Sequence, residues 1–257
     1  MTYFLGVDLG TSSLKMMLKS ADGSKEYIAS KAYQFASPKN GYAEHDSQEW
    51  WEACKIGFAE LENKYEVNLT EIEAISFSGQ MHGLIALDEN KEIIRPSILH
   101  CDARSDAQIK LMSEKIEKKT QIEILRNPFY TGFLLPSLLW VKENEYQNYQ
   151  KIKHVMLPKD YLIFMLTNKF ATDFSDASGT LAFDVVKQTW SEVILKKFDI
   201  PMEWFPPCYE IGTKIAKVDP ERAKEIGLSP NTIIVMGGGD QIMQGIGNAL
   251  LAVNQTS

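Results

Sequence analysis

Asp8 is the first residue whose setting suggests chemistry, because it ends the apolar run 3–8. Gly10, Thr11 and Ser12 follow it closely, and glycines and small hydroxyl residues let hydrogen-bond donors approach an anion such as phosphate. An aspartate repels phosphate, so Asp8 fits such a site if Mg²⁺ lies between the two, directly or through water. A simple hairpin turn is the alternative, and the pattern leaves both interpretations open.

Asp240 has a similar setting, because it follows three consecutive glycines at the end of the apolar run 232–236. Each glycine weakens a regular element by roughly 0.5–1 kcal/mol, so close approach of a ligand explains this run better than stability does. A carboxylate at such a strand end can accept a proton from an attacking hydroxyl group. A helix N-cap role for Asp240 is compatible with that chemistry. Segments 4–12 and 234–243 therefore share one pattern, in which an apolar strand ends in glycines around a single aspartate.

Two further groups of polar residues lie after predicted strands. Gln80 and His82 belong to the segment SGQMHG and could bind a polyol, although a lone histidine is more often structural. Asp102 and Arg104 follow the predicted strand that ends at residue 100, where a surface ion pair or helix capping is the simpler interpretation.

Several classes of site are excluded by the sequence. It has no GxxxxGK[ST] loop, no GxGxxG after a strand, and no metal-binding spacing among its four histidines. His100 and Cys101 are neighbours on a predicted strand, so they would point to opposite faces and cannot act as a nucleophile pair. The net charge of −7 argues against a nucleic-acid partner.

Composition and termini favour a soluble protein of the cytoplasm. The apolar fraction of 44% and charged fraction of 24% are typical of a globular domain. Three cysteines that are far apart in the sequence are typical of a protein in a reducing compartment. The first residues are predicted to form a strand and not a signal peptide. No apolar run approaches the roughly 20 residues that span a bilayer, so we expect no membrane partner.

The elements that must position these residues form an α/β pattern. Short apolar runs joined by tight turns predict an antiparallel meander of three strands at 3–8, 13–19 and 27–35. Further strands are expected at 72–77, 83–88, 92–99 and 232–236. Helices are expected after a cap at Asp46 or Ser47, over 105–119, around Pro136 and Pro158, over 190–198, between Asp219 and Gly227, and over 241–251.

Seven segments, in this order, resemble the FGGY family of carbohydrate kinases and, within it, the xylulokinases. They are YFLGVDLGTSSLK, ISFSGQMHGLIALDE, RPSILHCDAR, NPFYTGFLLPSLLWVKENE, MLPKDYLIFMLT, FATDFSDASGTLAFDV and the late GGGDQ. The resemblance implies an α/β fold of the ribonuclease-H-like (actin/hexokinase-type ATPase) class. Such a lobe has a mixed sheet that starts with three antiparallel strands and is flanked by helices.

The resemblance also implies a role for each candidate residue. Asp240 matches the catalytic base, and Asp8 matches the aspartate near Mg²⁺ and the phosphates, with Gly10, Thr11 and Ser12 beside them. The other matching positions are the substrate-binding pair Met81 and His82, with Gln80 next to them, and the sugar-site residues Asp102 and Arg104.

Two positions depart from the family pattern and leave the identity of the sugar substrate open. His100 stands where the family usually has tryptophan, and Ser137 stands where it often has lysine. The implied reaction is ATP-dependent phosphorylation of D-xylulose to D-xylulose 5-phosphate. Kinases for ribulose or for a sugar acid such as gluconate, and a non-catalytic sugar-binding lobe, stay open as alternatives.

Length sets a further expectation, because FGGY kinases are about twice as long as this chain. We expect residues 1–245 to form the N-terminal domain and 246–257 to begin the interdomain connection, with the C-terminal domain absent. An isolated lobe of this kind should bind sugar weakly and should not turn over ATP. The expected partners are the sugar and ATP with Mg²⁺, and we allow for a homodimer.

Overall fold

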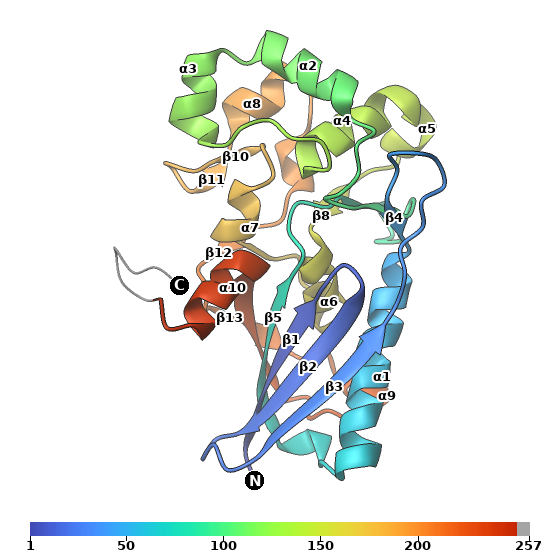
Figure 1. Ribbon diagram of the computed structural model, residues 1–257, viewed down its shortest axis with the longest axis vertical. Coiled ribbons are helices and arrows are strands. Elements are labelled where there is room, and N and C mark those ends of the chain that lie inside the picture. Colours follow the sequence, from blue (N-terminus) through green and yellow to red (C-terminus); the bar gives the residue numbers. More distant parts are fainter. Residues whose placement is uncertain (251–257) are drawn as a thin grey trace.

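A six-stranded mixed sheet forms the centre of the computed structural model, which describes residues 1–250 (Figure 1). The expectations for residues 251–257, which end the predicted last helix and interdomain connection, lie outside the described residues. From one edge to the other, the strands are β13 (Lys214–Lys217), β14 (Ile233–Gly239), β5 (Ile72–Gly79), β1 (Tyr3–Leu9), β2 (Ser13–Ser20) and β3 (Glu26–Ala32).

The predicted antiparallel start of the sheet is confirmed, because β2 pairs antiparallel with both β1 and β3. Side chains of β1 and β2 alternate between buried and exposed, as expected when one face of a sheet covers a core. The third strand ends at Ala32 and not at residue 35. Tyr33 instead ties the chain to the β1–β2 turn, where its N–H donates to the Ser12 carbonyl at 3.0 Å and its hydroxyl to the Gly10 carbonyl at 2.6 Å.

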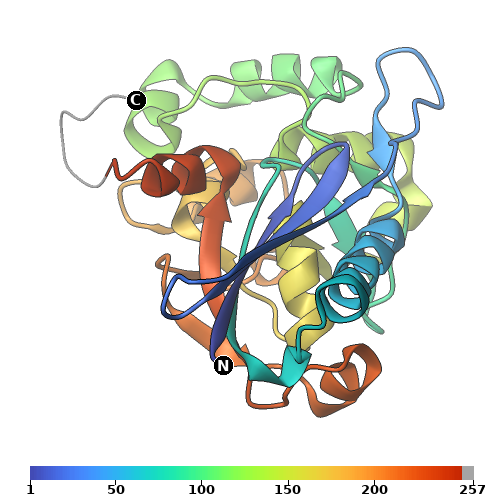
Figure 2. The same cartoon turned by 60° about the horizontal axis from the view of Figure 1, so that its bottom comes forward.

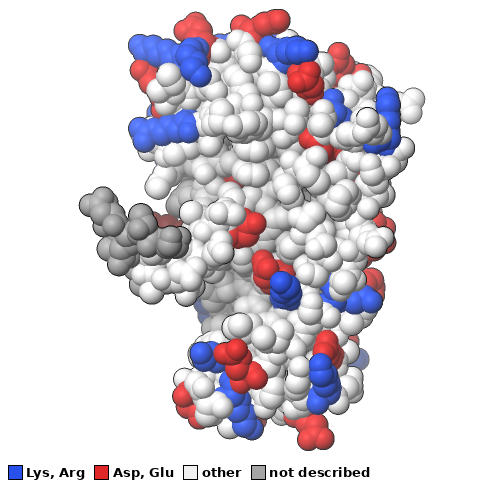
Figure 3. Space-filling view, viewed as in Figure 1, with Lys and Arg blue, Asp and Glu red and all other residues white. Residues whose placement is uncertain are grey.

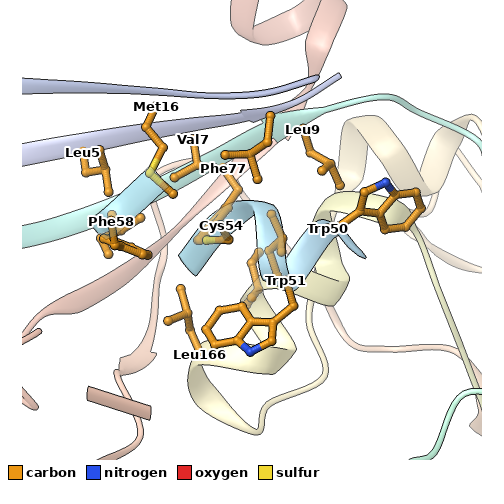
Figure 4. Close-up of a cluster of buried hydrophobic side chains, with 14 of the residues drawn as sticks. Leu5, Val7, Leu9, Met16, Trp50, Trp51, Cys54, Phe58, Phe77 and Leu166 are labelled. Atoms are coloured by element: carbon orange, nitrogen blue, oxygen red, sulfur yellow. The ribbon is translucent and has the colours of Figure 1, made fainter. Parts of the chain in front are cut away.

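Three helices, α1 (Ser47–Tyr65), α6 (Pro158–Thr167) and α9 (Pro220–Ile226), belong to the layer beside this sheet (Figure 2). Asp46 caps α1 as predicted, and its carboxylate accepts from the Gln48 N–H at 2.9 Å. The apolar stripe of α1 and the buried face of β1, β2 and β5 enclose one core, whose members in Figure 4 include Leu5, Val7, Met16, Trp50, Trp51, Cys54, Phe58 and Phe77.

A mainly helical part lies above the sheet in Figure 1 and buries a second hydrophobic cluster. Its helices are α2 (Asp106–Lys115), α3 (Lys118–Thr120) with a π-helical turn (Gln121–Leu125), α4 (Leu134–Asn144), α5 (Tyr146–Tyr149), α7 (Phe174–Ser178) and α8 (Glu192–Lys197). Four small sheets accompany them: β4 (Glu44–His45) with β7 (Ser97–Ile98), β6 (Ile85–Leu87) with β8 (His154–Met156), β9 (Thr172–Asp173) with β12 (Cys208–Tyr209), and β10 (Phe183–Asp184) with β11 (Thr189–Trp190).

Some predicted elements are shorter than the sequence pattern suggests. The expected strand 92–99 is reduced to Ser97–Ile98, which follows Pro96, a residue without an N–H for a strand ladder. The expected helix 105–119 stops at Lys115, because Ile116 turns into extended backbone and buries its side chain. Local propensity does not reveal such tertiary packing.

The glycine-rich end of β14 packs directly against β5 before the chain enters α10 (Asp240–Gly247). A Cβ atom on Gly237 would lie 1.7 Å from the carbonyl oxygen of Phe77, so no larger residue fits without moving the strand. The glycine run is thus partly a packing requirement. No helix within residues 1–250 is long and apolar enough to cross a membrane.

Gly237→Ala should lower the free energy of unfolding by roughly 2–3 kcal/mol, because overpacking against a buried backbone forces the strand to shift. Urea denaturation of the two proteins measures the difference. Gly245→Ala is the matched control, since a Cβ there would meet nothing within 4 Å, and it should change stability by less than about 1 kcal/mol. Equal effects at the two positions would contradict this account of the loop.

Candidate active site

Three parallel strands bring their carboxyl ends to one edge of the sheet. β1 and β14 both pair in parallel with β5, which lies between them. Asp8 lies opposite Ser78 of β5, and Gly239, the residue before Asp240, lies opposite Gly79. The structure therefore places Asp8 and Asp240 on either side of the end of β5.

The pKa of Asp8 reflects both burial and a second negative charge. Burial raises its pKa above the ordinary value, Lys15 lowers it, Asp240 raises it, and a hydrogen bond from Ser78 lowers it, with a raised pKa as the net result. Two carboxylates that repel each other in a half-buried setting favour a cation between them.

Asp240 is the first residue of α10 and is half-buried. Its Oδ1 atom accepts a hydrogen bond from the Gln241 N–H at 2.7 Å, which holds the carboxylate at the start of the helix. The positive end of the helix dipole stabilises a negative charge there. The N-cap itself is Gly239, so the predicted N-cap role belongs to the preceding residue.

Gln80 and Met81 directly follow β5, at the edge of the sheet where Asp8 and Asp240 lie. The Gln80 N–H donates to the Leu9 carbonyl at 2.8 Å, and its side chain is buried with neither amide atom bonded to another described residue. Such an unpaired buried amide has hydrogen bonds to offer a ligand. Met81 packs on the glycine loop, where its sulfur would lie 2.6 Å from a Cβ on Gly239.

His82 is held in an unusual backbone conformation, with φ of 74°. Its ring stacks on Phe133 with centroids 3.9 Å apart, and Nδ1 lies 3.1 Å from the Gly179 carbonyl oxygen. Because a carbonyl only accepts, Nδ1 carries the proton and Nε2 is left as an acceptor. Burial lowers the pKa of His82, the Gly179 contact and Asp240 raise it, and the net pKa is lowered, so the ring is neutral at pH 7.

His100 lies near the same charges. Burial lowers its pKa, while Asp240 raises it by a smaller amount, and its buried Nδ1 has no bonded partner within residues 1–250. Gly132, with φ of 75°, packs against the backbone here, since a Cβ on it would lie 2.1 Å from the His100 carbonyl oxygen. His100 therefore presents a neutral ring to the edge that holds Asp240.

The sequence of residues 3–247 matches the N-terminal domain of the FGGY family of carbohydrate kinases. This chain belongs to that family. It is 37% identical to the xylulose kinase of Lactococcus lactis over 98% of its own length. Its structure superposes on a ligand-bound xylulose kinase and on a gluconate kinase, both from Lactobacillus acidophilus, with TM-scores of 0.89 and 0.87, each at 27% identity and over 96% and 94% of this chain.

The ribonuclease-H-like lobe predicted for this FGGY chain is confirmed by the sheet order and by these structural relatives. The chain spans about half the length of the curated relatives it matches, 50% for the Lactococcus lactis protein. It covers 50% and 49% of the two Lactobacillus acidophilus chains. The matched region in each of them is thus one half of a longer protein.

In this FGGY chain, Asp102 and Arg104 form a buried ion pair and not a surface one. The guanidinium group of Arg104 lies 2.8 Å from Asp102 Oδ2 and 2.7 Å from Glu44, and it stacks on Tyr42 at 3.9 Å. Asp102 also accepts from the Ala43 N–H at 2.6 Å. These contacts occupy the polar atoms of the pair and hold the segment 41–45 against it.

Gly10, Thr11 and Ser12 form the turn between β1 and β2, and the Gly10 N–H donates to the Ser13 carbonyl at 3.0 Å. Within residues 1–250, no three His, Cys, Asp or Glu side chains are grouped closely enough to hold a metal ion by themselves. Asp8, Asp240 and the Ser78 hydroxyl offer oxygen atoms that fit Mg²⁺, provided that phosphates and water complete its coordination.

Sequence reasoning missed two residues that shape this edge, Phe133 and Gly179. Phe133 provides the surface beneath the His82 ring, and the Gly179 carbonyl oxygen accepts a hydrogen bond from its Nδ1–H group. A side chain on Gly179 would lie 2.5 Å from the ring. Both residues are 50 or more positions away from His82 in the sequence, so no local pattern connects them with it.

Proposed function

We propose that this chain is the sugar-binding half of an ATP-dependent kinase that converts D-xylulose to D-xylulose 5-phosphate. The observation that carries the proposal is the meeting of Asp8 and Asp240 at the end of β5, beside the unpaired amide of Gln80 and the neutral ring of His82. The xylulose kinase of Lactococcus lactis, at 37% identity, supports this sugar over others.

Asp240 is the proton acceptor of the proposed reaction. A terminal sugar hydroxyl gives its proton to the carboxylate as its oxygen attacks the γ-phosphorus of ATP, and the bond to the bridging oxygen breaks to leave ADP. Gln80 and the Nε2 atom of His82 would bind other sugar hydroxyls, and Met81 would cover an apolar part of the sugar. Their role is to place the attacking oxygen in line, which accounts for much of the rate in phosphoryl transfer.

Asp8 would hold Mg²⁺, directly or through water, beside the phosphates that approach Gly10, Thr11 and Ser12. Mg²⁺ supplies neutralisation of the phosphate charge when it is bound. Asp8 would thereby separate the negative nucleotide from the negative Asp240. In this assignment Asp102 and Arg104 shape the sugar site by holding the segment 41–45 in place.

The proposed activity belongs to a protein about twice as long, of which residues 1–245 would be the N-terminal domain. The family relatives are twice as long as this chain, and their second halves would supply the remaining nucleotide contacts. We therefore expect residues 1–257 to bind sugar and to show no turnover of ATP on their own.

A kinase for a sugar acid is the second candidate, because a gluconate kinase is as similar to this chain in structure as a xylulose kinase is. The electrostatics favour a neutral sugar. Asp8 and Asp240 already repel each other, and a substrate carboxylate would add a third negative charge to the same edge.

The full-length protein should use D-xylulose with a kcat/KM at least about 10-fold above that for D-ribulose or gluconate, a difference of about 1.4 kcal/mol. Coupled detection of ADP with each sugar at saturating ATP measures this ratio. Calorimetry of residues 1–257 should show heat of binding for D-xylulose and none for ATP with Mg²⁺. A higher kcat/KM for gluconate than for D-xylulose would favour the sugar-acid kinase. In the calorimetry, binding of neither D-xylulose nor ATP would contradict a sugar-binding lobe.

A further inference from the structure

A buried cluster of charges lies behind the glycine-rich loop and has no part in the chemistry proposed above. Lys159, at the start of α6, is fully buried, and its Nζ atom lies 2.6 Å from Asp160, 2.8 Å from Asp173 and 3.0 Å from Asp176. Burying each of these ions costs several kcal/mol, and well-packed apolar side chains often serve stability equally well. The cluster therefore calls for a role beyond stability.

Asp173 connects this cluster to α7. While its Oδ1 atom faces Lys159, its Oδ2 atom accepts from the backbone N–H of Ser175 at 2.7 Å and of Asp176 at 3.2 Å. The same Oδ2 atom accepts a hydrogen bond from the Ser175 hydroxyl group. Asp173 thus caps α7 and fixes the direction of the Ser175 hydroxyl, so that the lone pairs of Oγ face away from the cluster.

Ser175 in turn connects α7 to the loop that carries Asp240. Its Oγ atom accepts a hydrogen bond from the Gly239 N–H at 3.2 Å. Packing at this contact is close, because a Cβ on Gly238 would lie 3.1 Å from the same Oγ atom. Gly239 is the N-cap of α10, and the next residue is Asp240.

We propose that Ser175, oriented by Asp173 and the Lys159 cluster, is a positioning residue that fixes the Gly239 backbone and thereby the direction of the Asp240 carboxylate. In this role Ser175 acts through its hydrogen bond with the Gly239 N–H. The kinetic consequence rests on the proposed kinase function, whereas the contact itself does not. A general base must lie within hydrogen-bond reach of its proton, and a displacement of about 1 Å can lower a rate up to 10²-fold.

Ser175→Ala removes the hydroxyl that accepts from Gly239, and Ser175→Thr keeps it. In the full-length protein, Ser175→Ala should lower kcat about 10-fold or more and leave the KM for D-xylulose within about 2-fold, because the loss affects the reacting geometry and not sugar binding. Ser175→Thr should recover most of kcat. Ser178→Ala is the matched control on the same helix, since its hydroxyl bonds to the Ser175 carbonyl and not to the Asp240 loop.

Amide hydrogen exchange on the same proteins tests the contact without any assay of activity. The Gly239 amide should exchange about 10-fold faster in Ser175→Ala than in wild type, while the Ile234 amide near the start of β14 stays protected in both. This measurement still decides the matter if the wild-type protein phosphorylates none of the sugars, so failure of the proposed function is told apart from failure of this inference.

Three results would overturn the inference. The first is unchanged exchange at Gly239 in Ser175→Ala. The second is wild-type kcat in Ser175→Ala in an active kinase. The third is a parallel loss of kcat, sugar affinity and Tm that Ser175→Thr does not recover, because that pattern belongs to a purely structural residue.

Discussion

Asp240→Asn in the full-length protein is expected to lower kcat by about 10²- to 10⁴-fold, the usual contribution of a general base. Asparagine keeps the size of the side chain and an oxygen that can accept from the Gln241 N–H, but it cannot take up the sugar proton. Sugar binding, measured by calorimetry, should stay within a few-fold of wild type. The variant thus separates proton abstraction from substrate binding.

Asp106→Asn is the matched control for Asp240→Asn. Asp106 is also an aspartate in the first turn of a helix, but it is exposed on α2 and pairs with Lys110 at 3.0 Å, away from the strand ends. Its substitution should leave kcat unchanged. If Asp240→Asn kept more than about a tenth of the wild-type kcat, Asp240 would not be the base.

Lys159→Met should lower the free energy of unfolding by about 3–5 kcal/mol, the cost of leaving buried carboxylates without their cation. Lys159 faces three aspartates, and methionine fills a similar volume without charge. The pKa of Asp176 is already raised to about 7 by burial, so this carboxyl group takes up a proton readily. Without Lys159 the carboxyl groups must bind protons to stay buried, and the loss should be larger at pH 8 than at pH 5.

Urea denaturation at the two pH values measures this effect. Lys196→Met is the matched control, because Lys196 forms an exposed pair with Glu192 at 2.6 Å one helical turn away. Such an exposed pair contributes little to stability, so the control should be nearly neutral. A loss below about 1 kcal/mol for Lys159→Met at pH 8 would mean that the buried cluster is not electrostatically coupled as the distances indicate.

On the face shown in Figure 3, most lysines and arginines lie toward the two ends of the molecule, several of them beside acidic side chains, and no continuous basic stripe crosses the face.

The sheet and its first helix could be predicted because their signals are local. The alternation in residues 3–20, the Asp46 cap and the stop at Gly227, whose φ is 80°, each depend on neighbours in the sequence. The approach of Asp8 to Asp240 follows from the parallel pairing of β1 and β14 with β5, which no local pattern in the sequence shows.

The burial of the charged residues could not be predicted in the same way. Arg104 has the sequence setting of a surface residue, but in the fold Glu44 and Tyr42, which are 60 and 62 positions earlier, cover it. Lys159 looks exposed in the sequence, and only the fold brings Asp173 and Asp176 to its ammonium group. Contacts of this kind depend on the tertiary structure and leave no periodic signal.

Transfer of label from γ-³²P-labelled ATP to D-xylulose by the full-length protein, with and without Asp240→Asn, decides whether the proposed reaction takes place with Asp240 as its base. We expect labelled D-xylulose 5-phosphate with the wild-type protein and only background with the variant. Label transfer by the variant at the wild-type rate, or no transfer to any sugar by the wild-type protein, would contradict this expectation.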